Sequence, residues 1–169
     1  SNNLNELKDY TFYGCQSLDY LLLPNTLESI GEYCFYGCEN MPNLILPNGI
    51  KTIGSYAFAY CTLLDIMRIP NSVETIGGSI FAGCNNLKSI SIPFVGNSIK
   101  TAQDTYQYPL GYIFGTTSYE GSTATKQYYY GSSITKTTYS TYYIPNSLTS
   151  VGISNGIINY GAFYNCSNL

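Results

Sequence analysis

Apolar positions recur along the chain at a fixed interval of 23 residues. Three residue types mark the interval most clearly, each at its own place in the block: Phe12, Phe35, Phe58 and Phe81; Pro24, Pro47, Pro70 and Pro93; Cys15, Cys38, Cys61 and Cys84. Just before each proline, apolar residues occupy every second position, and this period of two predicts a short β-strand. Written once, the unit is L-x-x-L-x-L-P-N-x-L-x-x-I-G-x-x-A-F-x-x-C.

A block this short cannot enclose its own apolar face, so successive blocks must stack as the coils of a solenoid. The strands then pair in parallel, and the proline ends each strand because it has no backbone N–H. The second half of the block crosses the far side, with room for about one or two turns of helix. Its glycines, Gly31, Gly54 and Gly77, are expected at positive φ or at a close backbone approach. One column of isoleucines also keeps the interval: Ile30, Ile53, Ile76 and Ile99.

The segments LPNTLESIGEYCFYGC, LPNGIKTIGSYAFAYC and IPNSVETIGGSIFAGC closely resemble the BspA-like class of leucine-rich repeats (LRRs). The resemblance implies an α/β-type leucine-rich repeat fold, a right-handed, strand-rich solenoid or horseshoe of about 23-residue coils with a parallel β-sheet on its concave side. Members of this family are mostly bacterial surface or secreted proteins, and some are adhesins for host matrix proteins. The resemblance therefore also implies a bacterial cell-surface or extracellular location.

The repeat is interrupted in the second half of the chain. It covers residues 1–93, fails over 94–146, and resumes over 147–169 with a shortened coil. In that last coil Val151 and Ile153 are equivalent to Ile90 and Ile92, and Ser154 replaces the proline. We therefore expect a single LRR solenoid domain over 1–169 that carries a Tyr-rich β insertion.

Aromatic runs bounded by glycine within the insertion predict short strands. The expected strands are PLGYIFG (109–115) and QYYYGSS (127–133), in a hairpin or small sheet packed on the solenoid, and a further strand ends at Pro145. Tyr128, Tyr129 and Tyr130 run consecutively, so a strand must turn at least one of them outward, and we expect this to be Tyr129. These tyrosines either pack the insertion on the solenoid or bind a ligand.

Composition excludes several classes of function. The chain has no histidine, so Ser-His and Cys-His nucleophile pairs and the commonest zinc ligand are absent. A net charge of −3 with seven scattered basic residues argues against nucleic acid. No apolar stretch reaches the roughly 18 residues of a membrane span. We expect no enzyme activity, no catalytic residue, no cofactor and no metal.

The six cysteines invite a disulfide or zinc interpretation. Five hold one repeat position, where stacked, parallel side chains do not offer disulfide geometry, and one cysteine per coil does not make a zinc site. The sixth, Cys34, occupies the slot that Ala57 and Ala162 fill in other coils. We therefore expect buried thiols that act as small apolar core residues.

Candidate binding residues lie at the strand positions that point away from the core. Four of them are apolar and would cluster on the concave face: Tyr20, Leu22, Ile45 and Ile66. Arg68 lies at their edge. Either the insertion folds over this face, or the face is a partner-binding patch, since tyrosine and arginine are favoured at binding hot spots.

The expected function is a non-catalytic, secreted or surface protein-binding module that acts as an adhesin for host extracellular matrix or neighbouring-cell proteins. One alternative is carbohydrate binding by exposed tyrosines of the insertion, and another is a purely structural stalk. Both ends of the sequence fall within a repeat, so the array is expected either to continue in flanking repeats or to self-associate through uncapped ends.

Overall fold

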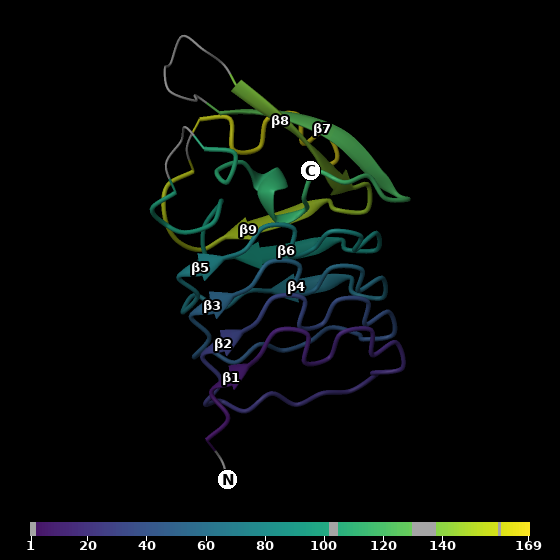
Figure 1. The fold of residues 1–169 in the computed structure, drawn as a ribbon. Helices are drawn as coiled ribbons and strands as arrows, with labels where there is room; N and C mark the ends of the chain where they lie inside the picture. The colour runs from purple at the N-terminus through teal and green to yellow at the C-terminus, as the bar shows by residue number, and fades with distance from the viewer. Residues whose placement is uncertain (1–2, 102–104, 130–137, 159) are drawn as a thin grey trace.

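The computed structural model describes residues 3–101, 105–129, 138–158 and 160–169. Its coils are stacked one on another from the N-terminus upward, and a hairpin closes the far end of the stack (Figure 1). Parallel strands form two sheets, one on each of two faces of the coils. Within the described ranges there is no α-helix, so the α/β class expected from the family resemblance is not confirmed.

The first sheet lies in the second half of the block, for which the sequence analysis left room for about one or two turns of helix and expected no strand. Its strands pair in parallel in the order β1 (Glu6–Leu7), β2 (Ser29–Ile30), β3 (Thr52–Ile53) and β5 (Thr75–Ile76). The register pairs Ser29 with Thr52 and Thr52 with Thr75, a step of 23 residues each time. In each strand the second residue is buried and the first faces outward, so the sheet has one core face and one solvent face.

The second sheet is the one that the alternation before each proline predicted. It contains β4 (Ile66–Arg68), β6 (Ser89–Ile92) and β9 (Ser150–Ile153), all parallel. β9 pairs directly with β6, with Ile90 opposite Val151 and Ile92 opposite Ile153, which is the predicted register of the resumed repeat. We call the outward surface of these strands, together with the equivalent segments 20–23 and 43–46, the L face.

Files of equivalent side chains fill the core between the two sheets. The phenylalanine rings stack along the solenoid with centroids 5.2 Å apart for Phe12 and Phe35 and 5.5 Å apart for Phe35 and Phe58. Phe81 continues the file, and Phe114 of the insertion takes the next place at 6.3 Å. Backbone bonds follow the same order, since Phe58 N donates to Ile80 O (3.0 Å) and Phe81 N donates to Ile113 O (2.9 Å). The insertion therefore supplies the next turn of the stack.

The glycines of the first sheet mark close approaches between coils, and their φ angles are not in the left-handed region. A Cβ atom at Gly31 would lie 2.4 Å from Asp9 N, and one at Gly54 would lie 2.5 Å from Glu32 N. Any side chain there would push two coils apart.

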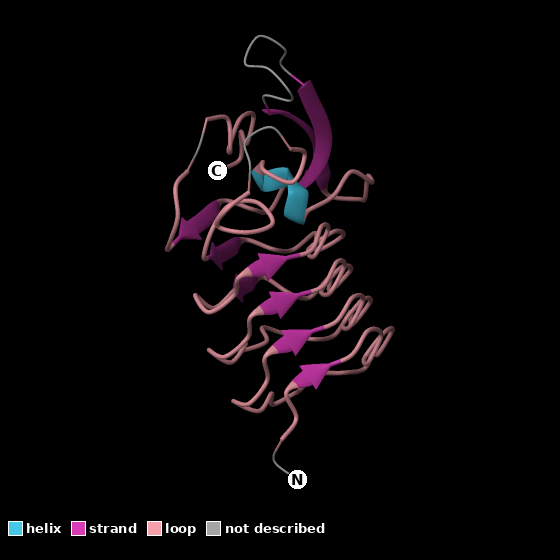
Figure 2. Cartoon of the chain, turned by 60° about the vertical axis from the view of Figure 1, so that its left-hand side comes forward, coloured by secondary structure: helices cyan, strands magenta, loops and turns pink. Residues whose placement is uncertain are grey.

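Two details of the insertion differ from the sequence-based expectation. The segment predicted as a strand at 109–115 contains instead the short 3₁₀ helix η1 (Leu110–Ile113), which lies between the stack and the hairpin (Figure 2). The hairpin pairs β7 (Ser122–Tyr129) with β8 (Thr138–Pro145), so its first strand begins five residues earlier than the predicted one at 127, while its second strand ends at Pro145 as predicted.

The isoleucine column also ends one coil early. Ile99 is 48% exposed, whereas Ile76 is 3% exposed. Beyond Gly96, which has a φ of 97°, the chain turns and Ser98 forms an antiparallel bridge with Thr75. Because the parallel register is lost at this point, the 23-residue spacing no longer places Ile99 in the core. In the described part of the chain, no helix is long and apolar enough to cross a bilayer.

Candidate functional site

The L face owes its shape to the alternation of its strands. Met67 and Ile69 point inward and are 1% and 2% exposed, so Ile66 and Arg68 must point outward. The same alternation holds in the two preceding coils, although these segments form no regular strand. Leu44 and Leu46 are buried there.

The predicted apolar binding residues are exposed on this face. Tyr20 is 71%, Leu22 76%, Ile45 86% and Ile66 54% exposed, and Arg68 beside them is exposed too. The hairpin lies at the opposite end of the stack from the first two coils (Figure 1). The alternative in which the insertion folds over this surface is therefore wrong for these residues. Large apolar side chains clustered in this way are unusual on a free surface.

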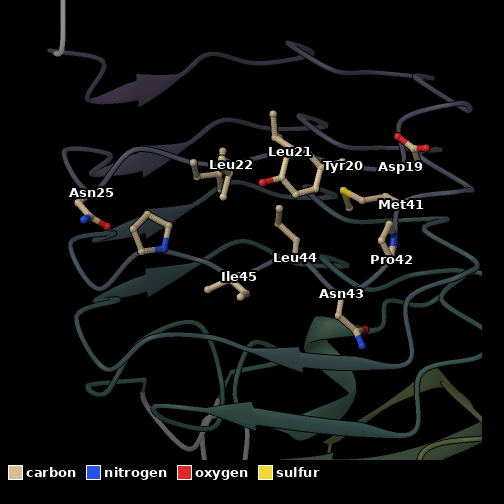
Figure 3. A pocket seen from close by; sticks show the side chains of 12 residues that line it. Asp19, Tyr20, Leu21, Leu22, Asn25, Met41, Pro42, Asn43, Leu44 and Ile45 are labelled. Carbon is tan, nitrogen blue, oxygen red and sulfur yellow. The ribbon is translucent and has the colours of Figure 1, made fainter.

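A hollow of about 300 Å³ opens between the first two coils of the L face. Tyr20 and Leu22 project from one coil beside it, and Asn43 and Ile45 project from the next (Figure 3). The full lining comprises Asp19, Tyr20, Leu21, Leu22, Leu23, Asn25, Met41, Pro42, Asn43, Leu44, Ile45 and Pro47. Most of this lining is aliphatic or aromatic, which is typical of a site for apolar side chains.

Backbone groups at the hollow are not used in the second sheet. Among the described residues, no backbone hydrogen bond joins segment 20–23 to 43–46, or 43–46 to β4. The side chain of Asn43 spans the latter gap, where its Oδ1 accepts a hydrogen bond from Ile66 N at 3.1 Å. On the side of segment 43–46, β4 is therefore joined to the preceding coil by this side-chain bond and by no backbone pairing.

Tyr128 and Tyr129 of the insertion are packed within the protein, whereas Tyr106 and Tyr139 are 55% and 50% exposed. Tyr128 packs against Tyr139 and meets the edge of the Tyr164 ring at a centroid distance of 5.2 Å. Tyr129, predicted to be exposed, is half-buried against the core, so that prediction is wrong. Tyr130 lies outside the described residues. Lys126 Nζ lies 3.7 Å from the centroid of Tyr139 and covers one face of that ring.

Gln127 is a central residue of the insertion that sequence reasoning missed. Its side chain is completely buried, and its Oε1 accepts a hydrogen bond from Gly111 N at 2.6 Å. Its Nε2 donates to Ala162 O and Tyr164 O, both at 3.1 Å. One backbone bond also joins η1 to the last coil, from Leu110 N to Ala162 O at 3.0 Å, and the amide side chain of Gln127 adds further bonds between the same two segments. A single glutamine among tyrosines carries no sequence signal of this role.

The cysteines are free thiols, and most of them behave as predicted. Cys34, Cys38, Cys61 and Cys84 are buried. Desolvation by burial raises the pKa of Cys38 to about 11 and that of Cys84 to about 12. Three thiols also make hydrogen bonds that the sequence did not reveal. Cys38, Cys61 and Cys84 each donate to the backbone carbonyl of the phenylalanine in the preceding coil, as Cys61 Sγ does to Phe35 O at 3.2 Å.

Two cysteines depart from the buried column. Cys15 in the first coil is exposed, and Cys166 in the last coil is half-buried. A cysteine of the buried column is covered by the coils on both sides of it. Cys15 and Cys166 lie in the first and last coils described, so each has a neighbouring coil on one side only. No three His, Cys, Asp or Glu side chains come together as a metal site in the described ranges.

Comparison with known proteins agrees with this architecture. The BspA type leucine rich repeat region matches residues 1–108 and 112–169 in six copies, so the match extends into the segment that interrupts the sequence repeat. No curated protein matches the chain.

Three solved structures are similar. A leucine-rich repeat protein from Bacteroides ovatus is 27% identical, with a TM-score of 0.52 over 89% of this chain and 32% of its own. The leucine rich repeat protein of T. pallidum is 21% identical (TM-score 0.52; 98% of this chain, 71% of its own), and the pneumococcal vaccine antigen PcpA is 19% identical (TM-score 0.54; 92% and 41%). This chain thus spans about a third of the length of the Bacteroides protein.

The stacked coils, the parallel strands and the extent of the repeat match lead to one assignment: the chain belongs to the family of BspA-type leucine-rich repeat proteins.

Proposed function

We propose that this protein is a non-catalytic binding module that recognises other proteins through the L face, and that residues 1–169 act as one unit in doing so. The observation that carries the proposal is the hollow between the first two coils with three highly exposed apolar side chains beside it: Tyr20, Leu22 and Ile45. An interface needs such a desolvated centre, and tyrosine is favoured there.

The exposed apolar side chains of two neighbouring coils favour an extended segment of the partner. Such a segment laid across 20–23 and 43–46 would place apolar side chains in the hollow. Arg68, at the edge of the patch, would meet acidic groups on the partner. We take the L face as the concave side of a right-handed solenoid of about 23-residue coils, where an extended partner can touch several coils at once.

We further propose a location at the bacterial cell surface or outside the cell, with host extracellular-matrix or surface proteins as the partners. This part rests on the family, in which adhesins occur, and on the fold shared with a pneumococcal antigen. Packing of Tyr128 and Tyr129 within the protein argues against sugar stacking on these two candidate residues.

The test measures binding of the protein to a panel of immobilised host extracellular-matrix proteins. The variant Leu22→Asp/Ile45→Asp introduces two charges at exposed positions of the L face, where the fold tolerates them. Leu63→Asp is the matched control, since Leu63 is 51% exposed and does not line the hollow. We expect saturable binding to a panel member that the double variant loses and the control keeps. Equal binding by the double variant, or no binding to any panel member, would contradict the proposal.

A further inference from the structure

Two rows of tyrosines run along the turns that follow β1, β2 and β3. In the first row Tyr10 stacks on Tyr33 and Tyr33 on Tyr56, with centroids 5.1 and 4.8 Å apart and rings nearly parallel. In the second row Tyr13 stacks on Tyr36 at 5.0 Å, and Tyr60 follows at 5.2 Å. Within the first two coils the rows are 5.6 Å apart. We call these six residues the tyrosine surface.

The tyrosine surface is not part of the core. Tyr10 is 57% and Tyr13 50% exposed, and the other four are partly exposed. In the described part of the chain, the residues that form the core or pack against it do not include any of the six. The phenylalanine file beneath them already fills this part of each coil. Core packing therefore does not account for the tyrosines.

Turn geometry does not require them either. Tyr10, Tyr33, Tyr56 and Tyr60 have φ between 53° and 59°, in the left-handed region that glycine and asparagine adopt most readily. At the position of Tyr60 the other coils carry Gly14, Gly37 and Gly83. A tyrosine in this conformation costs roughly 1–2 kcal/mol, of which ring stacking recovers a part. Strained residues of this kind cluster where a protein makes functional contacts.

The electrostatic environment of the tyrosine surface is acidic. A shallow groove along the solvent face of the first sheet borders the same turns, and its lining includes the carboxylates Glu6, Asp9 and Glu32 but no basic side chain. Asp9 Oδ1 accepts a hydrogen bond from Glu32 N at 2.7 Å. The ion pairs among the described residues are Lys51–Glu28 and Lys88–Asp65, so the groove carboxylates are not neutralised by a bridge. Lys8 is the exposed basic residue beside Asp9 in the sequence.

We propose that the tyrosine surface and the adjoining acidic groove bind a basic, extended segment of a partner protein. Arginine or lysine side chains of the partner pack on the tyrosine rings and pair with the groove carboxylates. The chain makes such a contact itself in the hairpin, where Lys126 lies over Tyr139. Because the stacked rings are held in place before binding, little side-chain entropy is lost on association.

Fluorescence anisotropy of a labelled peptide of alternating arginine and glycine, at low salt, tests the proposal. A peptide with glutamate in place of arginine is the matched ligand control. We expect the arginine peptide to bind and the glutamate peptide not to bind. Tyr33→Asn removes one ring while keeping a residue suited to positive φ, and it should weaken binding about fivefold or more. Glu6→Gln/Glu32→Gln, which changes charge alone, should also weaken binding and flatten its salt dependence.

Tyr20→Asn is the control that separates this surface from the L face, and it should bind the arginine peptide like the unmodified protein. If Tyr33→Asn does not fold, as judged by circular dichroism, the charge variant decides the question. The proposal is overturned if the arginine peptide does not bind, if the glutamate peptide binds equally, or if the charge variant binds with unchanged affinity. Loss of binding in Tyr20→Asn would overturn it as well, since it would assign the peptide to the L face.

Discussion

Replacement of Gln127 by leucine tests how much this one side chain contributes to holding the insertion on the last coil. The substitution keeps the size of the residue and removes its hydrogen bonds to Gly111, Ala162 and Tyr164, together with the longer contact from Nε2 to Cys166 Sγ at 3.5 Å. Gly111 N is left as a buried donor without a partner, at a cost of about 1–3 kcal/mol. Ala162 O keeps the hydrogen bond from Leu110 N, and Tyr164 is exposed to water, so each of these lost bonds costs about 0.5–1.5 kcal/mol.

The sum is a destabilisation of about 3 kcal/mol, since the buried leucine side chain offsets part of the loss. Urea unfolding followed by circular dichroism measures it. Gln16→Leu is the matched control, because Gln16 is exposed and makes one side-chain bond to Glu39 at 3.3 Å, so its change should stay within about 0.5 kcal/mol. A Gln127→Leu variant that unfolds at the same urea concentration as the control would refute the assigned role.

Three further predictions follow from the packing. Phe58→Ala should destabilise the protein by about 3–5 kcal/mol in urea unfolding, because this fully buried ring touches Phe35 and Phe81; a loss below about 1 kcal/mol would contradict the stacked file. A thiol reagent applied to the native protein should modify Cys15 rapidly and leave Cys34, Cys38, Cys61 and Cys84 unmodified until unfolding, so rapid modification of several thiols would count against the buried column. Stability should be constant near neutral pH and fall above about pH 9. Burial raises the folded-state pKa of Cys34 from 9.0 to about 12 and that of Cys38 from 9.0 to about 11, and it raises the pKa of Tyr33 and Tyr36 above 10.0, so the unfolded chain loses these protons first as the pH rises. A free energy of unfolding that increases with alkaline pH would be inconsistent with this.

The repeat made much of the fold predictable. Equal spacing of phenylalanines and cysteines specifies which residues stack, and the alternation at Met67 and Ile69 specifies which side of the strand is buried. The outward position of Leu22 and Ile45 follows from the same alternation. These predictions rest on a period, which is the strongest signal that a sequence of stacked coils carries.

The first sheet was not predictable in the same way. Two residues such as Thr52 and Ile53 are too few to show a period of two, and their strand exists because equivalent residues in the neighbouring coils pair with them. The structure of a coil thus depends on its neighbours as well as on its own sequence.

The strand prediction for the insertion was wrong at the segment that continues the stack. Its PLGYIFG segment is rich in aromatic residues, which favours a strand, but Phe114 enters the phenylalanine file and the preceding residues form η1. Contacts between distant segments decided this outcome, and no periodicity was left to reveal them. The same holds for Gln127, whose partners lie 16 to 37 residues away in the chain.

Residue-resolved amide hydrogen exchange tests the central claim most directly, namely that coils stack tightly through the phenylalanine file while the L face of the first two coils stays open. The amides of Phe35, Phe58 and Phe81 donate to the next coil and should be strongly protected. Those of Leu22 and Ile45, which have no backbone partner among the described residues, should exchange near the rate of an unstructured chain. Strong protection of Leu22 and Ile45, or fast exchange at the phenylalanines, would contradict the account.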